Sequence, residues 1–188
     1  MRIISGKARG TKLYTLEGTE TRPTLDRVKE SLFNIINSRI YDSTVLDLFS
    51  GSGAIGLEFA SRGAKKVILC DISKNATDII QKNIEKTHLE NIIKLYNIDF
   101  KKMLEKIKNN KIDIIYLDPP YKTDYIKDAI SLIKNNKILN DDGVIIAETD
   151  EPEKIKKQLE EINIKNINQR KYGRANLFFI EKLYNDDL

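Results

Sequence analysis

The chain has 188 residues, a hydrophobic fraction of 40% and a net charge of +4, which suits one domain with a sizeable core and at most a small appendage. One cysteine, Cys70, and one histidine, His88, exclude an internal disulfide framework and a multi-histidine metal site, and they make a Ser-His-Asp hydrolase a poor fit. The sequence has no run of about 20 apolar residues for a membrane helix and no apolar signal at its start, so we expect a soluble, cytoplasmic protein that holds no metal.

The N-terminal part of the chain holds the whole net charge. Residues 1–40 contain eight basic and four acidic residues, whereas the two kinds balance in the remainder. Five of the eight arginines lie in this segment, and the planar guanidinium fork suits phosphate. A solvated basic face is the alternative to a nucleic-acid contact. The candidate phosphate-contacting residues here are Arg2, Lys7, Arg9, Lys12, Arg22 and Arg27.

The first elements in chain order are a hairpin and a helix. Residues 1–22 carry three glycines and short β-like pieces, which predict a small irregular hairpin. Residues 24–40 follow as a helix. Its expected buried stripe is Leu25, Val28, Leu32, Ile35 and Ile36.

From residue 44 onward, strand and helix patterns alternate. The expected strands are 44–48, 66–70, 92–96, 113–117 and 143–148. The expected helices are 54–62, 73–86 (capped by Ser73), 100–107, 124–134 and 151–161. Residues 164–170 and 177–182 look like two strands joined by a turn at Gly173, which would add an antiparallel hairpin at a sheet edge. The pattern predicts an α/β fold with a doubly wound, mainly parallel sheet.

A glycine loop follows the strand at 44–48. The segment Gly51-Ser52-Gly53-Ala54-Ile55-Gly56 matches the GxGxxG pattern, and Asp71 lies 20 residues beyond Gly51, where an acid can take ribose hydroxyls. These features alone fit a dinucleotide dehydrogenase, or a tight turn without a ligand. Asp47, at the strand end, suits a cationic ligand better than a pyrophosphate. S-adenosylmethionine carries a sulfonium and an α-ammonium group and no phosphate, so it is the favoured cofactor.

A second motif, Asp118-Pro119-Pro120-Tyr121, follows the strand at 113–117. Ligands of open α/β sheets bind at this edge of the sheet. The Asp118 carboxylate and the Pro119 carbonyl can accept hydrogen bonds from an exocyclic amine, the proline pair stiffens the loop, and Tyr121 can stack on a base. This favours methyl transfer to an amine nitrogen, driven by alignment. A rigid turn is the alternative.

Two further pairs complete the candidate site. Asp99 can accept from the adenine N6 amine, with Phe100 against the ring, although helix capping by Asp99 is the competing role. Lys171 and Arg174 can meet phosphate, or can belong to a plain turn. The residues expected to bind the cofactor are Asp47, Phe49, Ser50, Gly51, Gly53, Asp71, Ile72, Asp99 and Phe100.

With these motifs in hand, the sequence closely resembles the RsmD family of 16S ribosomal RNA guanine-N2 methyltransferases. The resemblance runs nearly end to end and includes the starts at 1–6 and 7–10, the segment 21–34, the glycine loop from 46 to 53, the segment 117–121 and 171–173. The stretch Thr-Arg-Pro-Thr-x-Asp-Arg-Val-Lys-Glu at 21–30 is the most family-specific piece.

The resemblance implies a Rossmann-like class I methyltransferase with a seven-stranded, mainly parallel sheet. It implies an N-terminal β-hairpin extension over 1–22 that contacts RNA, and a methyltransferase domain over 23–188. By match, Thr21, Arg22 and Pro23 would border the cofactor and the RNA. The substrate would be the N2 amine of one guanine in the head of the small ribosomal subunit, modified during assembly. The sequence leaves the oligomeric state open, and nothing in it demands more than a monomer. Asp71 stands where the family often has Glu, and Ala175 where a Thr is expected.

Three other functions remain as alternatives. A DNA adenine-N6 methyltransferase shares the Asp-Pro-Pro-Tyr chemistry but would need a sequence-reading insertion, for which 188 residues leave little room. A protein glutamine methyltransferase would carry Asn at position 118. A non-catalytic RNA-binding assembly factor would have no need of the acids at 47, 71 and 118.

Overall fold

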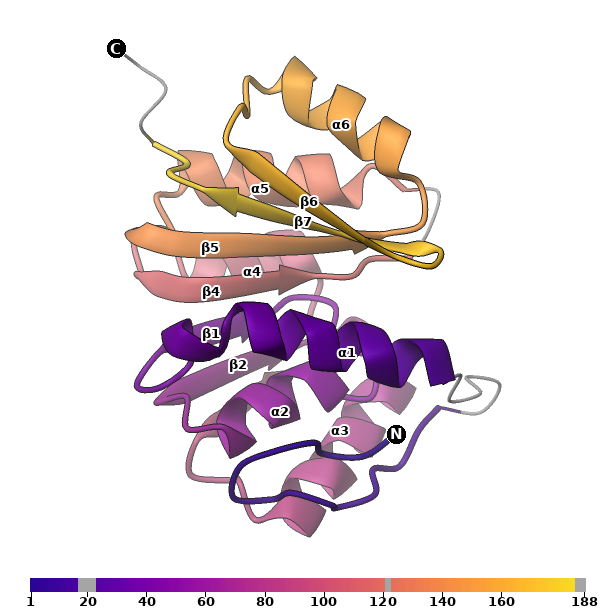
Figure 1. The fold of residues 1–188 in the computed structure, drawn as a ribbon. Coiled ribbons are helices and arrows are strands. Elements are labelled where there is room, and N and C mark those ends of the chain that lie inside the picture. The colour runs from indigo at the N-terminus through magenta and orange to yellow at the C-terminus, as the bar shows by residue number, and fades with distance from the viewer. Residues whose placement is uncertain (17–22, 121–122, 185–188) are drawn as a thin grey trace. The chain divides into compact units, whose positions relative to one another are not determined.

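A computed structural model of the chain describes residues 1–16, 23–120 and 123–184 (Figure 1). The chain divides into two units, residues 1–99 and 100–188. Across the described residues, no helix combines the length and the apolar character that crossing a membrane requires. Thr21, Arg22 and Tyr121 lie outside the described residues, as do the side chains of Pro23 and Leu25.

The first unit is built on three parallel strands, β1 (Thr44–Asp47), β2 (Lys66–Cys70) and β3 (Ile93–Tyr96), in the order β3-β2-β1. Two helices, α2 (Ala54–Ser61) and α3 (Lys74–Thr87), connect them (Figure 1). Parallel strands need such crossovers, so the expected alternation of strand and helix is confirmed here.

Two residues, Ser73 and Gly56, explain where α3 begins and how closely α2 packs on the strands. The Ser73 side chain accepts from the Ala76 N–H at 3.3 Å and caps α3, as expected. At Gly56, in α2, an added Cβ would lie 2.1 Å from Leu69 Cδ2 of β2. The third glycine of the loop motif is therefore needed because helix and strand approach closely there.

The helix before β1 differs from the expectation. α1 spans Pro23–Ile35, and a short 3₁₀ turn, η1 (Asn37–Arg39), replaces the rest of the predicted helix. Val28, Leu32 and Ile36 are buried as expected, but Ile35 is 44% exposed, so its place in the buried stripe was wrong. Because Phe33 is also buried, the buried arc is displaced toward the Phe33 side, and Ile35 falls outside it.

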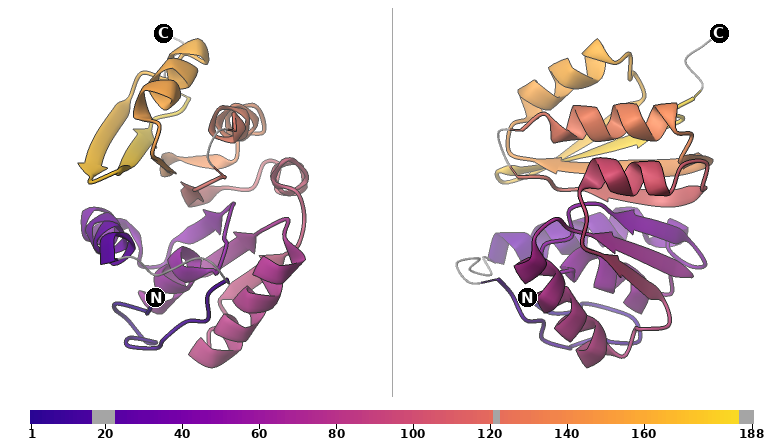
Figure 2. Two further views of the ribbon diagram at one scale, coloured as in Figure 1. Left: turned by 90° about the vertical axis from the view of Figure 1, so that its right-hand side faces the viewer. Right: turned by 180° about the vertical axis from the view of Figure 1, so that it is seen from behind.

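Residues 1–16, the described part of the N-terminal segment, form an irregular hairpin as expected. Arg2 and Lys12 make an antiparallel bridge, and the Ile3 N–H donates to the Thr11 carbonyl at 3.0 Å. Ile3, Ala8 and Leu13 are buried, so the hairpin is packed onto the unit. Figure 2 shows the segment beside α2 and α3, to which it is hydrogen-bonded. The boundary after residue 22 stays a prediction.

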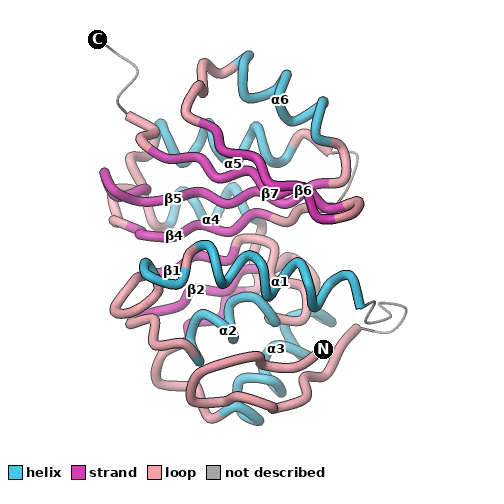
Figure 3. Tube along the Cα trace, viewed as in Figure 1, coloured by secondary structure: helices cyan, strands magenta, loops and turns pink. Residues whose placement is uncertain are grey.

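The second unit holds four strands in the order β4-β5-β7-β6 (Figure 3). The parallel pair is β4 (Ile112–Leu117) and β5 (Leu139–Thr149), and β7 (Ala175–Glu181) runs antiparallel to both β5 and β6 (Ile167–Tyr172). The helices are α4 (Phe100–Lys106), α5 (Tyr125–Asn135) and α6 (Pro152–Glu161). α5 packs on β5 and on both other helices. The predicted C-terminal hairpin is confirmed.

Strand ends in this unit depart from the prediction. β5 begins at Leu139 instead of 143, because Leu139 pairs with Ile112 of β4 before the register shifts and Val144 pairs with Ile114. The intervening polar residues, to which the sequence pattern assigns no element, form an irregular stretch of the strand. The strands β6 and β7 approach the Gly173 turn more closely than predicted, with Tyr172 opposite Ala175.

Candidate active site

The glycine loop lies between β1 and α2 and is tied to the end of β2. Ser50 donates its N–H to the Cys70 carbonyl and accepts from the Cys70 N–H through Oγ, both at 3.0 Å. Gly51 and Gly53 have φ values of 55° and 78°, a conformation that favours glycine, and Gly53 is the N-cap of α2. The two glycines therefore let the chain turn sharply from strand to helix.

Asp71 holds the same loop from the end of β2. Its Oδ2 accepts from the Gly51 N–H at 2.8 Å, and its Oδ1 accepts from the Ser73 N–H at 2.8 Å. The spacing of 20 residues thus brings Asp71 beside Gly51, as the motif predicts. Each carboxylate oxygen has lone pairs beyond those the backbone uses, so Asp71 is able to accept further bonds from a ligand.

Asp47 is more deeply buried than Asp71, with 1% of its surface exposed. Its Oδ2 accepts from the Gly56 N–H at 3.2 Å, whereas its Oδ1 has no hydrogen-bond partner among the described residues. Burial raises the pKa of Asp47 from 3.8 to about 7, the Gly56 bond opposes this, and repulsion from Asp71 adds to it. A buried carboxylate with one uncompensated oxygen would be stabilised by a cation.

The expected adenine-binding residues lie on both sides of the unit boundary. Ile72 is 72% exposed, and Asn97 donates through Nδ2 to the carbonyls of Asp71 and Ile72, both at 3.0 Å. These bonds fix the main chain that carries the Ile72 side chain just beyond β2. Phe49 and Asp99 are half-buried. Phe100 is buried at the start of α4, and its ring centroid lies 5.0 Å from that of Tyr125.

The second motif follows β4 directly. Asp118 is half-buried, Pro119 is buried and Pro120 is exposed. The Thr123 hydroxyl donates to the Pro120 carbonyl at 2.9 Å, which ties the end of the described part of the motif to the chain that precedes α5. Pro119 and Pro120 have no N–H, so the loop offers acceptors at these positions and no competing backbone donors.

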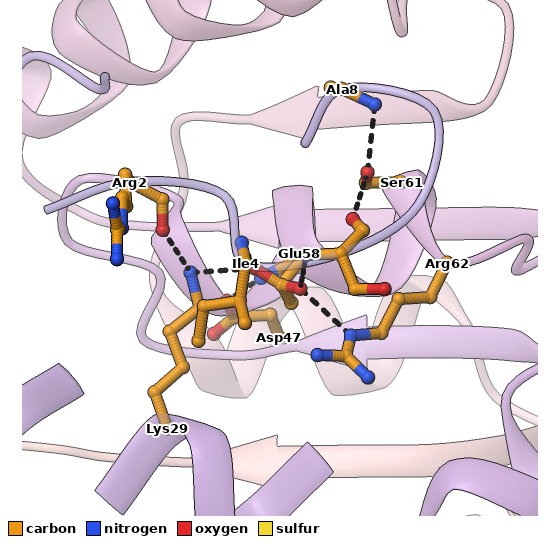
Figure 4. A network of polar contacts seen from close by, with 10 residues as sticks. Arg2, Ile4, Ala8, Lys29, Asp47, Glu58, Ser61 and Arg62 are labelled. Atoms are coloured by element: carbon orange, nitrogen blue, oxygen red, sulfur yellow. Dashed lines mark hydrogen bonds and ion pairs between the residues drawn. The ribbon is translucent and has the colours of Figure 1, made fainter. Parts of the chain in front are cut away.

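The N-terminal segment that carries most of the candidate RNA-binding residues is hydrogen-bonded to α2 through its main chain. Arg2, Lys7, Arg9 and Lys12 are exposed, and Arg27 is exposed on α1. The Glu58 carboxylate of α2 accepts from the N–H groups of Ile4 and Ser5 at 2.8 and 2.9 Å, as Figure 4 shows for Ile4. Ser61 Oγ accepts from the Ala8 N–H at 3.0 Å and donates to the Ser5 carbonyl (Figure 4).

Lys29 differs from the other basic residues of the N-terminal part. Its Nζ lies 2.9 Å from Glu58 Oε2, with side chains 3% and 0% exposed, and also donates to the Arg2 carbonyl (Figure 4). Arg62 pairs with the other Glu58 oxygen at 2.8 Å. Lys29 is therefore an internal cation that cannot contact a ligand. Lys171 and Arg174, at the turn between β6 and β7, are exposed.

Sequence reasoning missed Glu58 and Asn83. Asn83, in α3, is buried and bonds both to Tyr14 and to Ser52 of the glycine loop. Glu58 lies on the apolar helix α2 and Asn83 on the buried face of α3, so both are polar residues at core positions. Because buried polar groups in proteins are hydrogen-bonded, a polar residue at a core position of the sequence pattern indicates a structural contact of this kind.

The residues at the glycine loop fit S-adenosylmethionine. The uncompensated Asp47 Oδ1 suits a cationic group, and the exposed Ile72 suits an apolar ring. A Cβ at Gly51 would meet no atom within 4 Å, so there is space beside the loop backbone. The site offers the carboxylates of Asp47 and Asp71, which do not suit a pyrophosphate.

Comparison with known proteins agrees with this geometry. A family model described as "Conserved hypothetical protein 95" matches residues 1–181. Ribosomal RNA small subunit methyltransferase D of Haemophilus influenzae is 37% identical over 154 residues, which cover 80% of this chain and 79% of the relative.

Two solved structures support the fold class. The protein yhhF from Escherichia coli has a TM-score of 0.77 at 28% identity, covering 96% of this chain and 98% of that one. The 16S rRNA N2 G1207 methyltransferase RsmC of Thermus thermophilus, solved with AdoMet and guanosine, has a TM-score of 0.73 at 22% identity, covering 89% of this chain and 45% of that one. The expected Rossmann-like class I methyltransferase fold is confirmed. Because the family model spans nearly the whole chain and the relative is similar over most of both lengths, the chain belongs to the RsmD family.

Proposed function

We propose that this chain transfers a methyl group from S-adenosylmethionine to the exocyclic N2 of a guanine in 16S ribosomal RNA. The substrate class is supported by family membership, since a relative 37% identical is named as a small-subunit rRNA methyltransferase. The structural observation that carries the proposal is the buried Asp47 carboxylate, whose Oδ1 lacks a partner among the described residues beside the glycine loop.

When bound, S-adenosylmethionine supplies a methyl group activated on sulfonium. Asp47 binds the ammonium end electrostatically, and Asp71 accepts hydrogen bonds from the ribose hydroxyls. Ile72 provides an apolar surface for the adenine, and Asp99 accepts from its amine. Phe49, Ser50, Gly51, Gly53 and Phe100 shape the cofactor site, and Thr21 and Pro23 complete it.

Asp118 acts on the guanine amine. The N2 lone pair is delocalised into the base, and acceptors on its two N–H bonds draw the nitrogen toward a pyramidal nucleophile. The Asp118 carboxylate is one acceptor and the Pro119 carbonyl is the other, while Pro120 stiffens the loop. Tyr121 stacks on the extruded base. The reaction depends on alignment of the amine with the methyl carbon and on hydrogen bonding.

The exposed basic residues hold the RNA backbone. Arg2, Lys7, Arg9, Lys12 and Arg27 belong to this surface, joined by Arg22, Lys171 and Arg174. Phosphate contacts of this kind position the RNA and make binding dependent on salt. The substrate is an assembling small subunit in the cytoplasm, and a monomer suffices for the reaction.

Labelled methyl transfer tests the proposal. Small ribosomal subunits from a strain that lacks this methyltransferase are incubated with the chain and methyl-labelled S-adenosylmethionine, beside naked 16S rRNA, duplex DNA and a peptide with glutamine. We expect label on the subunit and, by mass mapping, on one guanine N2. Label on DNA or on the peptide, or no transfer to any substrate, would contradict the proposal.

A further inference from the structure

Asn83 joins two segments of the first unit that lie far apart in the sequence. Its Nδ2 donates to the Tyr14 carbonyl at 2.9 Å and to the Ser52 carbonyl at 3.0 Å, and its Oδ1 accepts from the Tyr14 N–H at 2.8 Å. The side chain is 0% exposed. Burying an amide is costly unless its hydrogen bonds are made, and here both amide hydrogens and the oxygen are used.

The two segments belong to different parts of the proposed reaction. Ser52 lies between Gly51 and Gly53, in the loop that borders the cofactor site. Tyr14 closes the N-terminal hairpin, two residues after Lys12. Asn83 binds both the N–H and the carbonyl of Tyr14, so it fixes the position of the main chain independently of the Tyr14 side chain.

A second contact strengthens the attachment of the hairpin to α3. Lys86 Nζ lies 4.3 Å from the centroid of the Tyr14 ring, one turn of α3 beyond Asn83. The opposite end of the hairpin is held on α2 by Glu58 and Ser61. The exposed cations Arg9 and Lys12 therefore lie between two attachments, and Lys7 lies within the one on α2. The attachment at Asn83 reaches the glycine loop directly.

We propose that Asn83 is a positioning residue that couples cofactor binding at the glycine loop to RNA binding by the N-terminal hairpin. The inference rests on the proposed function. A ligand that orders the loop fixes the Ser52 carbonyl, which fixes the Asn83 amide and through it the Tyr14 main chain. By thermodynamic linkage, RNA that orders the hairpin then raises the affinity for the cofactor by the same factor.

The test measures the affinity of the chain for unmethylated small subunits with and without S-adenosylhomocysteine. In the native sequence we expect S-adenosylhomocysteine to tighten subunit binding about fivefold or more, a typical coupling. In Asn83→Ala this factor falls to about one, while each ligand alone still binds. Asn83→Asp, which places a carboxylate against the Ser52 and Tyr14 carbonyls, reduces the coupling as well. A coupling that survives in Asn83→Ala would overturn the proposal.

Thr87→Val is the matched control. Thr87 is buried on the same helix, and its hydroxyl donates only to carbonyls of α3 in the described structure, at 2.8 Å to Asn83 and 3.0 Å to Ile84. This variant removes a buried polar group without touching the loop or the hairpin, so it should keep the native coupling. Loss of coupling in Thr87→Val would count against a specific role of Asn83.

Hydrogen exchange of the native chain keeps the inference testable if the Asn83 variants do not fold. Addition of S-adenosylhomocysteine should slow exchange of the Tyr14 amide, which is bound to Asn83 Oδ1. An unchanged Tyr14 amide would overturn the coupling. Binding of both ligands without mutual effect refutes the coupling alone, whereas failure of the native chain to bind either one refutes the proposed function.

Discussion

Lys29 and Glu58 form an ion pair inside the first unit, with Nζ and Oε2 2.9 Å apart and side chains 3% and 0% exposed. Burial alone would raise the pKa of Glu58, but Lys29, the Ile4 N–H and Arg62 together hold that pKa below 4.5. The pair joins α1 to α2 and to the N-terminal hairpin. Removing one partner of such a pair leaves a buried charge less compensated.

Lys29→Met should therefore lower the free energy of unfolding by about 3 kcal/mol, because Glu58 stays buried, keeps Arg62 and loses the Lys29 counter-ion. Urea denaturation measures this change. Lys74→Met is the control, since the Lys74–Asp78 pair of α3 is exposed and its loss should cost less than about 1 kcal/mol. Equal losses in both variants would contradict the internal role of Lys29.

Cofactor binding should depend on pH through Asp47. Its folded pKa of about 7 exceeds the ordinary 3.8, so the ligand-free protein loses stability as pH rises from about 4 to about 7. A cationic ligand favours the charged carboxylate and displaces the proton. The affinity for S-adenosylhomocysteine should then be about fivefold weaker at pH 6 than at pH 7.

Calorimetry in buffers of different ionisation heat measures both the affinity and the proton released. Asp47→Asn should bind weakly and without this pH dependence. Asp42→Asn changes an exposed acid with φ of 60°, which Asn tolerates, and should behave like the native chain. Proton uptake on binding would show that Asp47 does not meet the cation.

Asp118→Ala should separate chemistry from cofactor binding. Loss of the acceptor for the guanine amine should reduce kcat by about 100-fold or more, while S-adenosylhomocysteine binds as before. Single-turnover methyl transfer to small subunits, combined with calorimetry, checks both. Asp141→Ala, an exposed acid of β5, should leave kcat unchanged. Unaltered turnover in Asp118→Ala would remove this residue from the mechanism.

The double variant Arg9→Ala, Lys12→Ala tests the RNA surface. Each phosphate contact to a single strand contributes about 0.7 to the slope of log affinity against log salt, so two lost contacts should reduce that slope by about 1.4. Titration of subunit binding between low and moderate salt gives the slope. The exposed pair Lys108 and Lys137 serves as the control. A slope equal to that of the native chain would exclude the hairpin from the interface.

Local signals in the sequence predict much of this structure. The Ser73 cap, the glycine loop and the placement of Asp71 each depend on residues close in sequence or on a fixed strand–loop–helix spacing, and the structure confirms all three positions. Cys70 is buried and its thiol donates to the Ile98 carbonyl, as suits a small residue of a central strand. His88 is the exposed C-cap of α3.

Features that depend on tertiary contacts could not be predicted from local sequence signals. The ion pair of Lys29 has no local signal, because its Glu58 partner lies on another helix. Asn83 had no local signal beyond its place on a buried helix face. Ile35 fitted the helical period but lies outside the buried arc, and β5 begins early because Ile112 of β4 provides a partner for Leu139.

The position of β7 has a consequence for synthesis. β6 (Ile167–Tyr172) precedes β7 (Ala175–Glu181) in the chain, yet β7 lies between β6 and β5 and pairs with both. While the chain is being made, the edge of β5 and the edge of β6 that each pair with β7 stay open until residue 181 has left the ribosome. The strands of the first unit are complete by Tyr96 and can fold earlier. A nascent chain stalled between these points would carry a folded glycine loop and an unfinished sheet, whose open strand edges could pair with other strands.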